Sequence, residues 1–284
     1  MSNIYLWAAS VALIFVACNK SNDCLDSAVA TQGHNMLLIG NSFFKPYAEQ
    51  LDQLAIDAGF PQHTSTRITR GGENGRPINF WNDSLTQAHL DIKAALDQGN
   101  INVFGMTAGH DLEDRIAGHR AWIDYALQSN PDISIFIAIP QITFPASWDS
   151  LALANGFNTI QEYFSDGINT VVHDSMVDPL RAEFPNVNIF TVPTGWASFD
   201  LAQMHLDGTL LDDIDWFGPE ETSLFTDDLG HQGDIIVETG SLVWLNSLYQ
   251  VDLATHTSET TFNTDLHEIA KHITDNHDPN YRFE

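Results

Sequence analysis

The sequence predicts an α/β protein, a three-layer α/β/α domain built on a mostly parallel five-stranded sheet. Two observations carry this prediction: short apolar runs alternate along the chain with longer segments of helical periodicity, and five such runs occur within about 230 residues. Strands that alternate with helices of this length pair in parallel, and helices then cover both faces of the sheet. A hydrophobic content of 43% supports a globular core.

The expected elements follow one another in a regular order. The predicted strands are residues 36–40, 63–69, 102–108, 133–140 and 187–192. The predicted helices are residues 48–59, 85–96, 116–127, 160–184 and 234–249. A glycine-rich turn at residues 71–75 follows the second strand. Residues 206–225 are acidic and irregular, and are either a lid near the site or a solvated surface.

The N-terminus indicates export. Residues 4–18 form an apolar run that is too short to span a bilayer, which takes roughly 20 residues, and that suits a signal peptide over residues 1–18. The run ends in Phe-Val-Ala-Cys, which resembles a bacterial lipoprotein signal and implies lipid on Cys18. Alternatively, Cys18 pairs with Cys24, the other cysteine. We expect a periplasmic, outer-membrane-anchored or extracellular protein.

The rest of the chain divides into three expected parts. Residues 19–33 are a polar tether, residues 34–252 the α/β domain, and residues 253–284 a polar C-terminal appendage.

The charge balance excludes some partners. Asp and Glu number 38 against 11 Lys and Arg, a formal net charge of -27. Such a surface repels nucleic acid and anionic membranes, so membrane attachment is expected only through lipid on Cys18. Two explanations of the charge stay open: adaptation to salty water, where ions screen the repulsion, or an acidic exported protein that does not need salt.

A serine follows the first predicted strand. Gly40-Asn41-Ser42 lies between that strand and a helix, where a parallel sheet collects its functional residues. The helix start also stabilises an anion. The alternative is that Ser42 only caps the helix.

A second motif precedes the last predicted helix. In Asp228-Leu-Gly-His231 the carboxylate can hold the imidazole in one tautomer while the other ring nitrogen faces a nucleophile. Asp227 is an adjacent candidate, but the spacing favours Asp228. The alternative is a helix-capping aspartate beside a surface histidine.

Together, Gly40-Asn41-Ser42-Phe43 and Asp228-Leu-Gly-His231 resemble the motifs of the SGNH (GDSL-type) hydrolase family over residues 36–252. The resemblance implies a flavodoxin-like fold in which Ser42 is the nucleophile, His231 the general base and later acid, and Asp228 the orienting carboxylate. No Gly-x-Ser-x-Gly motif occurs, which disfavours the ordinary α/β-hydrolase fold.

The family also implies an oxyanion hole. Its donors would be the N–H of Ser42, the N–H of Gly71 or Gly72, and a side chain of the third block. That block reads Ala108-Gly109-His110-Asp111 here, where family members often have Gly-x-Asn-Asp, so His110 takes the place of the asparagine. A neutral imidazole N–H can donate the same hydrogen bond.

The sequence therefore predicts a serine esterase that needs no metal or cofactor and that removes acetyl groups from polysaccharide or cleaves small esters. Two alternatives compete with it. One is an exported carbohydrate- or ligand-binding protein that keeps the fold with weak or no catalysis. The other is a metal-dependent hydrolase that uses His110, Asp111 and His231. Separately, three tryptophans either line a sugar-binding cleft or belong to the core: Trp148, Trp196 and Trp216.

Overall fold

A computed structural model describes residues 32–109 and 113–283, which belong to one compact unit. The signal peptide predicted at residues 1–18, lipidation of Cys18 and nearly all of the tether at residues 19–33 lie outside the described residues, as do His110 and Asp111. Within the described part, no helix is long and apolar enough to cross a membrane.

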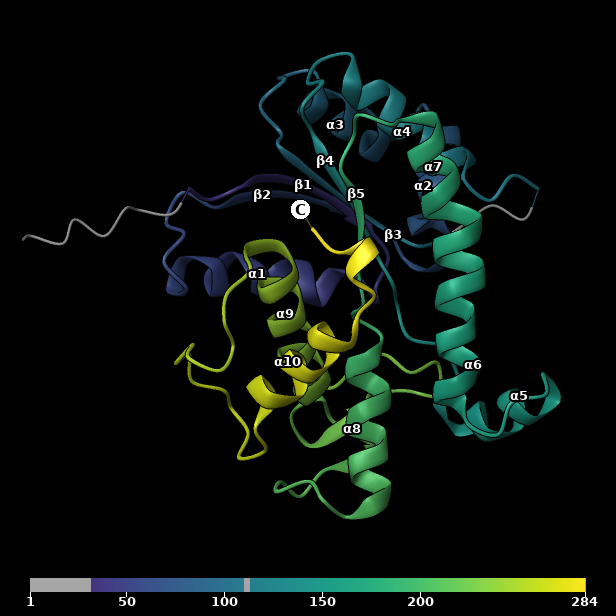
Figure 1. Ribbon diagram of the computed structural model, residues 1–284, viewed down its shortest axis with the longest axis vertical. Coiled ribbons are helices and arrows are strands. Elements are labelled where there is room, and N and C mark those ends of the chain that lie inside the picture. The colour runs from purple at the N-terminus through teal and green to yellow at the C-terminus, as the bar shows by residue number, and fades with distance from the viewer. Residues whose placement is uncertain (1–31, 110–112, 284) are drawn as a thin grey trace, which may run out of the picture. The chain divides into compact units, whose positions relative to one another are not determined.

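The predicted fold class is confirmed. Five parallel strands form one sheet in the order β2-β1-β3-β4-β5, the flavodoxin-like order. The strands are β1 (Asn35–Gly40), β2 (Thr64–Thr69), β3 (Val103–Thr107), β4 (Ser134–Ala138) and β5 (Ile189–Val192). Figure 1 shows α1, α9 and α10 on one side of this sheet and α2, α3 and α4 on the other.

The strands differ in polarity according to their place in the sheet. Central β1 is apolar over Met36–Ile39, and these side chains are fully buried because helices cover both faces. Edge strand β2 is polar and partly exposed, which explains its alternating sequence pattern. Pairing of Gly40 with Thr69 brings the carboxyl ends of β1 and β2 level, so the loops that follow them lie at one sheet edge.

The described part of the chain contains a helix at each predicted segment and four more that the sequence did not predict, α2, α5, α8 and α10. Their bounds are α1 (Lys45–Asp57), α2 (Pro77–Asn82), α3 (Gln87–Leu96), α4 (Ala117–Leu127), α5 (Trp148–Ala154), α6 (Ile160–Gly167), α7 (Asp178–Glu183), α8 (Trp196–Asp207), α9 (Asp234–Tyr249) and α10 (Leu266–Asn276). The predicted helix at residues 160–184 is continuous, but its central part, η3 (Ile168–Val177), is a π-helix. Pro179 then lacks the N–H that would continue the α-helical bonding pattern.

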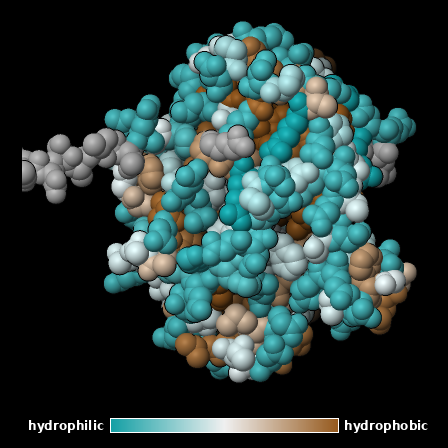
Figure 2. Space-filling view, viewed as in Figure 1, coloured by the Kyte–Doolittle hydropathy of each residue, from teal (hydrophilic) through white to brown (hydrophobic). Residues whose placement is uncertain are grey.

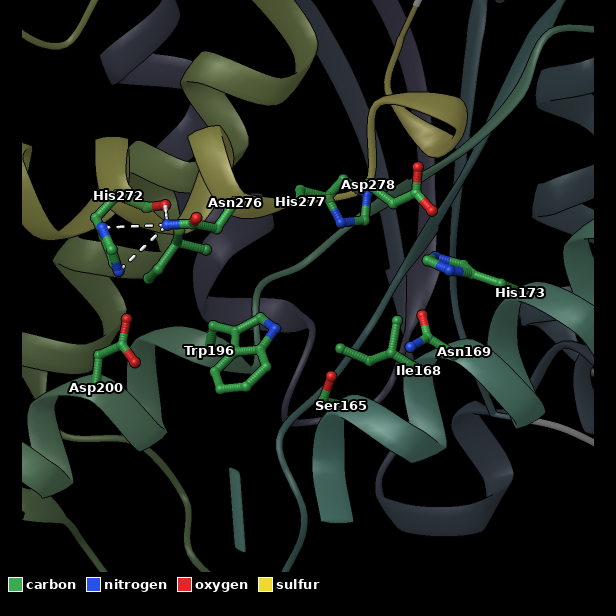
Figure 3. Close-up of a pocket in the computed structure, with 11 residues that line it drawn as sticks. Ser165, Ile168, Asn169, His173, Trp196, Asp200, His272, Asn276, His277 and Asp278 are labelled. Carbon is green, nitrogen blue, oxygen red and sulfur yellow. Dashed lines mark hydrogen bonds between the residues drawn. The ribbon is translucent and has the colours of Figure 1, made fainter. Parts of the chain in front are cut away.

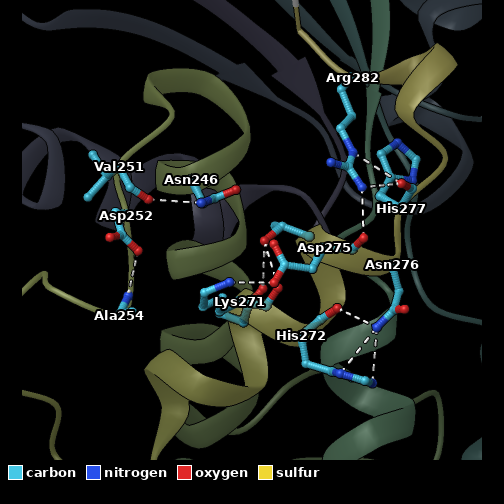
Figure 4. A network of polar contacts seen from close by, with 12 residues as sticks. Asn246, Val251, Asp252, Ala254, Lys271, His272, Asp275, Asn276, His277 and Arg282 are labelled. Atoms are coloured by element: carbon cyan, nitrogen blue, oxygen red, sulfur yellow. Dashed lines mark hydrogen bonds and ion pairs between the residues drawn. The ribbon is translucent and has the colours of Figure 1, made fainter.

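The C-terminal segment is part of the domain, so the expected appendage at residues 253–284 is wrong. Helix α10 packs against α8 and α9, and its apolar residues Leu266, Ala270 and Ile273 are buried. Only one face of this helix is apolar, which is why the segment as a whole looks polar in sequence. Arg282 fastens the end of the chain by donating to the carbonyl oxygens of Asp275 and His277 (Figure 4).

The acidic segment at residues 206–225 is ordered around a small sheet. Strands β6 (Asp215–Phe217) and β7 (Ser223–Phe225) pair in parallel, with the 3-10 turn η4 (Glu220–Thr222) between them. The Asp212 carboxylate accepts hydrogen bonds from the backbone N–H groups of Asn263 and Thr264, both at 2.9 Å. These hydrogen bonds link the segment to the residues that precede α10. The face of the molecule in Figure 2 is largely hydrophilic, as the net charge of -27 requires.

Candidate active site

Ser42 lies in a tight turn at the carboxyl end of β1. The Asn41 side-chain oxygen accepts the N–H of Phe43 at 3.0 Å, and the Asn41 carbonyl accepts the N–H of Lys45 at 3.0 Å, which starts α1. Gly40 is required here, because a Cβ atom on it would lie 2.4 Å from the Phe44 ring. The turn therefore sets Ser42 at the sheet edge and at the start of a helix.

A second tight loop carries the histidine. The Thr226 N–H donates to the His231 carbonyl at 2.8 Å and closes the loop. Inside it, Asp227 Oδ1 accepts the backbone N–H groups of Gly230 and His231 at 3.0 and 3.1 Å. Gly230 has a φ of +94°, a backbone conformation that favours glycine. The loop thus turns the Asp227 carboxylate towards the imidazole of His231.

The two loops bring three side chains into a hydrogen-bonded chain. Ser42 Oγ lies 2.8 Å from His231 Nε2, and His231 Nδ1 lies 2.6 Å from Asp227 Oδ2. Burial disfavours the ionised form of Asp227, but hydrogen bonds from His231 and Gly230 outweigh it and lower the pKa of this carboxyl. An ionised Asp227 accepts a hydrogen bond from Nδ1–H, which keeps the proton on Nδ1 and leaves Nε2 free to accept the proton of the serine hydroxyl.

The prediction of Asp228 as the orienting carboxylate is wrong. Asp227 holds His231 Nδ1, whereas Asp228 is exposed and makes no hydrogen bond to His231. The spacing argument failed because Asp227 also caps the N–H groups of the turn, a role that places its side chain inside the loop. The neighbouring Asp228 consequently points elsewhere.

Neighbouring side chains hold this chain in place, and of these only Phe43 belongs to a motif that the sequence singled out. The ring of Phe43 stacks on the His231 imidazole, with centroids 4.8 Å apart and an interplanar angle of 13°. Buried Gln141 donates to the Gly230 carbonyl at 2.5 Å, and the Phe144 N–H donates to the Leu229 carbonyl at 3.0 Å. The loop after β4 therefore supports the histidine loop.

In the glycine-rich turn, the glycine that packs against Asn41, next to Ser42, is Gly75. Gly71 and Gly72 are exposed, and an added Cβ would meet no atom within 4 Å at either position. Gly75 is buried, and its added Cβ would lie 2.6 Å from the Cβ of Asn41. Only the closeness of Gly75 to the loop that carries Ser42 could have identified it, and sequence spacing does not show this closeness. His110, the third predicted oxyanion donor, is outside the described residues.

The site is open to solvent. The side chains of His231 and Asp227 are 31% and 46% exposed. The void of about 10 Å³ that Phe43, Thr107 and Ala138 line in part lies in the core, and none of Ser42, His231 and Asp227 lines it. Among the described residues, no cluster of His, Cys, Asp and Glu could hold a metal ion.

No family model and no curated protein matches this sequence. Among solved structures, a DUF4886 family protein from Bacteroides uniformis is similar with a TM-score of 0.53 and 14% identity, over 86% of this chain and 94% of that one. The periplasmic domain of a lipopolysaccharide acetyltransferase from Salmonella ser. Paratyphi A gives a TM-score of 0.42 and 15% identity, over 77% of this chain and 83% of that one. The first similarity supports the fold alone.

Proposed function

We propose that the protein is a serine esterase of the SGNH type that cleaves carboxylic esters with Ser42, His231 and Asp227. The observation that carries the proposal is the continuous chain of hydrogen bonds from Ser42 Oγ through both ring nitrogens of His231 to Asp227. A serine, a base and an orienting carboxylate in this order are the parts that acyl transfer requires.

The proposed reaction has two steps. Ser42 Oγ attacks the ester carbonyl carbon while its proton passes to His231 Nε2, and Asp227 stabilises the imidazolium that forms. The tetrahedral intermediate collapses when the alcohol leaves with the proton from His231 and the acyl group stays on Ser42. Water then attacks the acyl-enzyme, gives a proton to His231, and the carboxylic acid leaves as Ser42 recovers its proton.

The oxyanion needs N–H donors near Ser42. The N–H of Ser42 itself and the glycine-rich turn supply them in this proposal. Gly75 joins Gly71 and Gly72 as a candidate, since Gly75 is the glycine that packs against Asn41. One such donor contributes roughly 100- to 1,000-fold in rate. His110 keeps its proposed role as the side-chain donor.

The proposed substrate is an ester that reaches an open site. The exposed side chains of His231 and Asp227 admit an ester that projects from a bulky molecule. An acetyl group on a polysaccharide fits this feature, as does a small free ester. Export, which the N-terminal sequence predicts, would place the enzyme where such polymers occur.

Hydrolysis of p-nitrophenyl acetate and p-nitrophenyl decanoate tests the proposal. We expect cleavage of the acetate ester and no effect of a metal chelator, while the rate with the decanoate measures the acyl-length preference. Ser42→Ala should lower kcat/KM by at least about 1,000-fold, while Ser84→Ala, a change at an exposed serine elsewhere, should leave it unchanged. A folded Ser42→Ala protein that retains full activity, or a chelator that abolishes activity, would refute the proposal.

A further inference from the structure

A pocket of about 460 Å³ lies apart from the candidate active site, between η3, α8 and α10 (Figure 3). Trp196 begins α8 shortly after the carboxyl end of β5, and in the strand order two strands separate β5 from the β1 strand that precedes Ser42. At about 4.8 Å between neighbouring strands, the two places are roughly 14 Å apart along the sheet edge. The volume is in the range of pockets that bind small molecules.

The back of the pocket is formed by two neutral histidines. Burial is the main cause that lowers the pKa of His173 and of His277 to about 4. The Thr191 hydroxyl lies 2.8 Å from His277 Nε2 and 3.2 Å from His173 Nε2. Within the described part of the chain, the other nitrogen of His173, Nδ1, has no hydrogen-bond partner, and this side chain is only 2% exposed. The back of the pocket is therefore polar and carries no positive charge on these two rings.

Trp196 and Asp200 form one wall. They are four residues apart on α8 and therefore lie on the same face of the helix. Among the described residues, no hydrogen bond reaches the Asp200 carboxylate, and burial raises the pKa of this group to about 6 although His272 acts in the opposite direction. The Asp200 carboxylate, which is partly exposed, is thus free to accept hydrogen bonds from a ligand on the same wall as Trp196.

The remaining side chains fit a neutral polar ligand. At the rim, Asn169 offers an amide that both donates and accepts hydrogen bonds, and Asn276, whose N–H₂ group contacts His272, offers its amide oxygen as an acceptor. The neutral histidines provide no positive charge, and Asp200 and Asp278 repel anions. A sugar ring matches these features, since its C–H face packs on an aromatic ring and its hydroxyl groups both donate and accept.

We propose that this pocket is a binding site for a neutral carbohydrate of one or two sugar residues. Trp196 stacks on the sugar ring, Asp200 accepts hydrogen bonds from its hydroxyl groups, and the rim amides contact the neighbouring hydroxyls. The site is independent of the ester chemistry.

The test measures binding by isothermal titration calorimetry and ligand-observed NMR on the Ser42→Ala protein, in which esterase activity plays no part. The probes are neutral disaccharides of glucose, galactose, mannose, xylose and N-acetylglucosamine, each at about 10 mM, with tetramethylammonium as a cationic probe. We expect at least one disaccharide to bind with a Kd of about 0.1–10 mM.

Variants locate the binding. Asp200→Asn, which keeps the shape of the side chain, and Trp196→Ala should each weaken binding by about tenfold or more. Asp207→Asn, an exposed change on the same helix, should leave the Kd unchanged. Circular dichroism checks that each variant is folded. The proposal is overturned if no disaccharide binds, if binding survives both pocket variants, or if only tetramethylammonium binds through Asp200.

Discussion

Replacing Asp227 with asparagine tests how the carboxylate orients His231. The amide oxygen of the new side chain can still accept the turn N–H groups that Asp227 Oδ1 accepts at 3.0 and 3.1 Å, so we expect the loop to keep its shape. The amide N–H₂ would then face His231 Nδ1, where Oδ2 now lies at 2.6 Å. An N–H donor at that place favours the tautomer with the proton on Nε2, which cannot accept the Ser42 proton.

The expected loss follows from this geometry. A wrong tautomer in a buried triad lowers kcat by about 10⁴-fold. Here the carboxylate side chain is 46% exposed, so water can partly replace it, and we expect a fall of about 100- to 10,000-fold in kcat. Because the change acts on catalysis and not on substrate contacts, KM should change little.

Asp228→Asn is the matched control, because it makes the same chemical change at the adjacent exposed residue. In steady-state kinetics with p-nitrophenyl acetate, the kcat of Asp228→Asn should lie within about twofold of that of the unmodified protein. If Asp228→Asn is the damaging change and Asp227→Asn is harmless, the assignment of the carboxylate is wrong.

Three further predictions concern stability. Gly40→Ala should lower the free energy of unfolding by about 1–3 kcal/mol or more, because the added Cβ meets the Phe44 ring at 2.4 Å. In the control Gly71→Ala the added Cβ meets no atom within 4 Å, so the free energy of unfolding should change by about 0.5 kcal/mol or less. Equal effects of the two changes in urea titrations would contradict the packing argument. The free energy of unfolding should fall as the pH drops from 6.5 towards 4, because in this range the unfolded chain binds protons at His173 and His277 while the folded protein does not. The full loss is at most about 3 kcal/mol per histidine. A urea midpoint that does not depend on pH, in the unmodified protein and in a His277→Gln variant alike, would refute this prediction. Raising NaCl from 0.1 M to 1 M shortens the screening length from about 10 to 3 Å and so weakens the repulsion within a chain of net charge -27. The urea midpoint should therefore rise. An unchanged or lower midpoint would show that self-repulsion is unimportant.

The parts of the structure that follow from local pattern could be predicted from the sequence. The apolar run at residues 36–40 identifies a buried strand, and its position ahead of a helix identifies Ser42 as a residue at the carboxyl end of a parallel sheet. Helical periodicity predicts α9, and the position of His231 just ahead of that helix places this residue in a loop. These features depend on residues that are close in sequence, so they are visible without the fold.

The parts that depend on three-dimensional packing could not be predicted. The choice between Asp227 and Asp228 is decided by which carboxylate caps the turn N–H groups. The importance of Gly75 depends on its contact with Asn41, a residue that reaches it only through pairing of β1 with β2. Helix α10 looks polar in composition because the core covers only one of its faces.

Labelling with a fluorophosphonate probe, followed by peptide mapping, tests the central claim most directly. The probe reacts only with an activated serine, so the reaction reports on the link between Ser42 Oγ and His231 Nε2 at 2.8 Å. We predict one label, on Ser42, that is absent in Ser42→Ala, lost or strongly slowed in His231→Ala and unaffected in Ser84→Ala. A folded protein that takes no label, or that takes it on a different serine, would contradict the account.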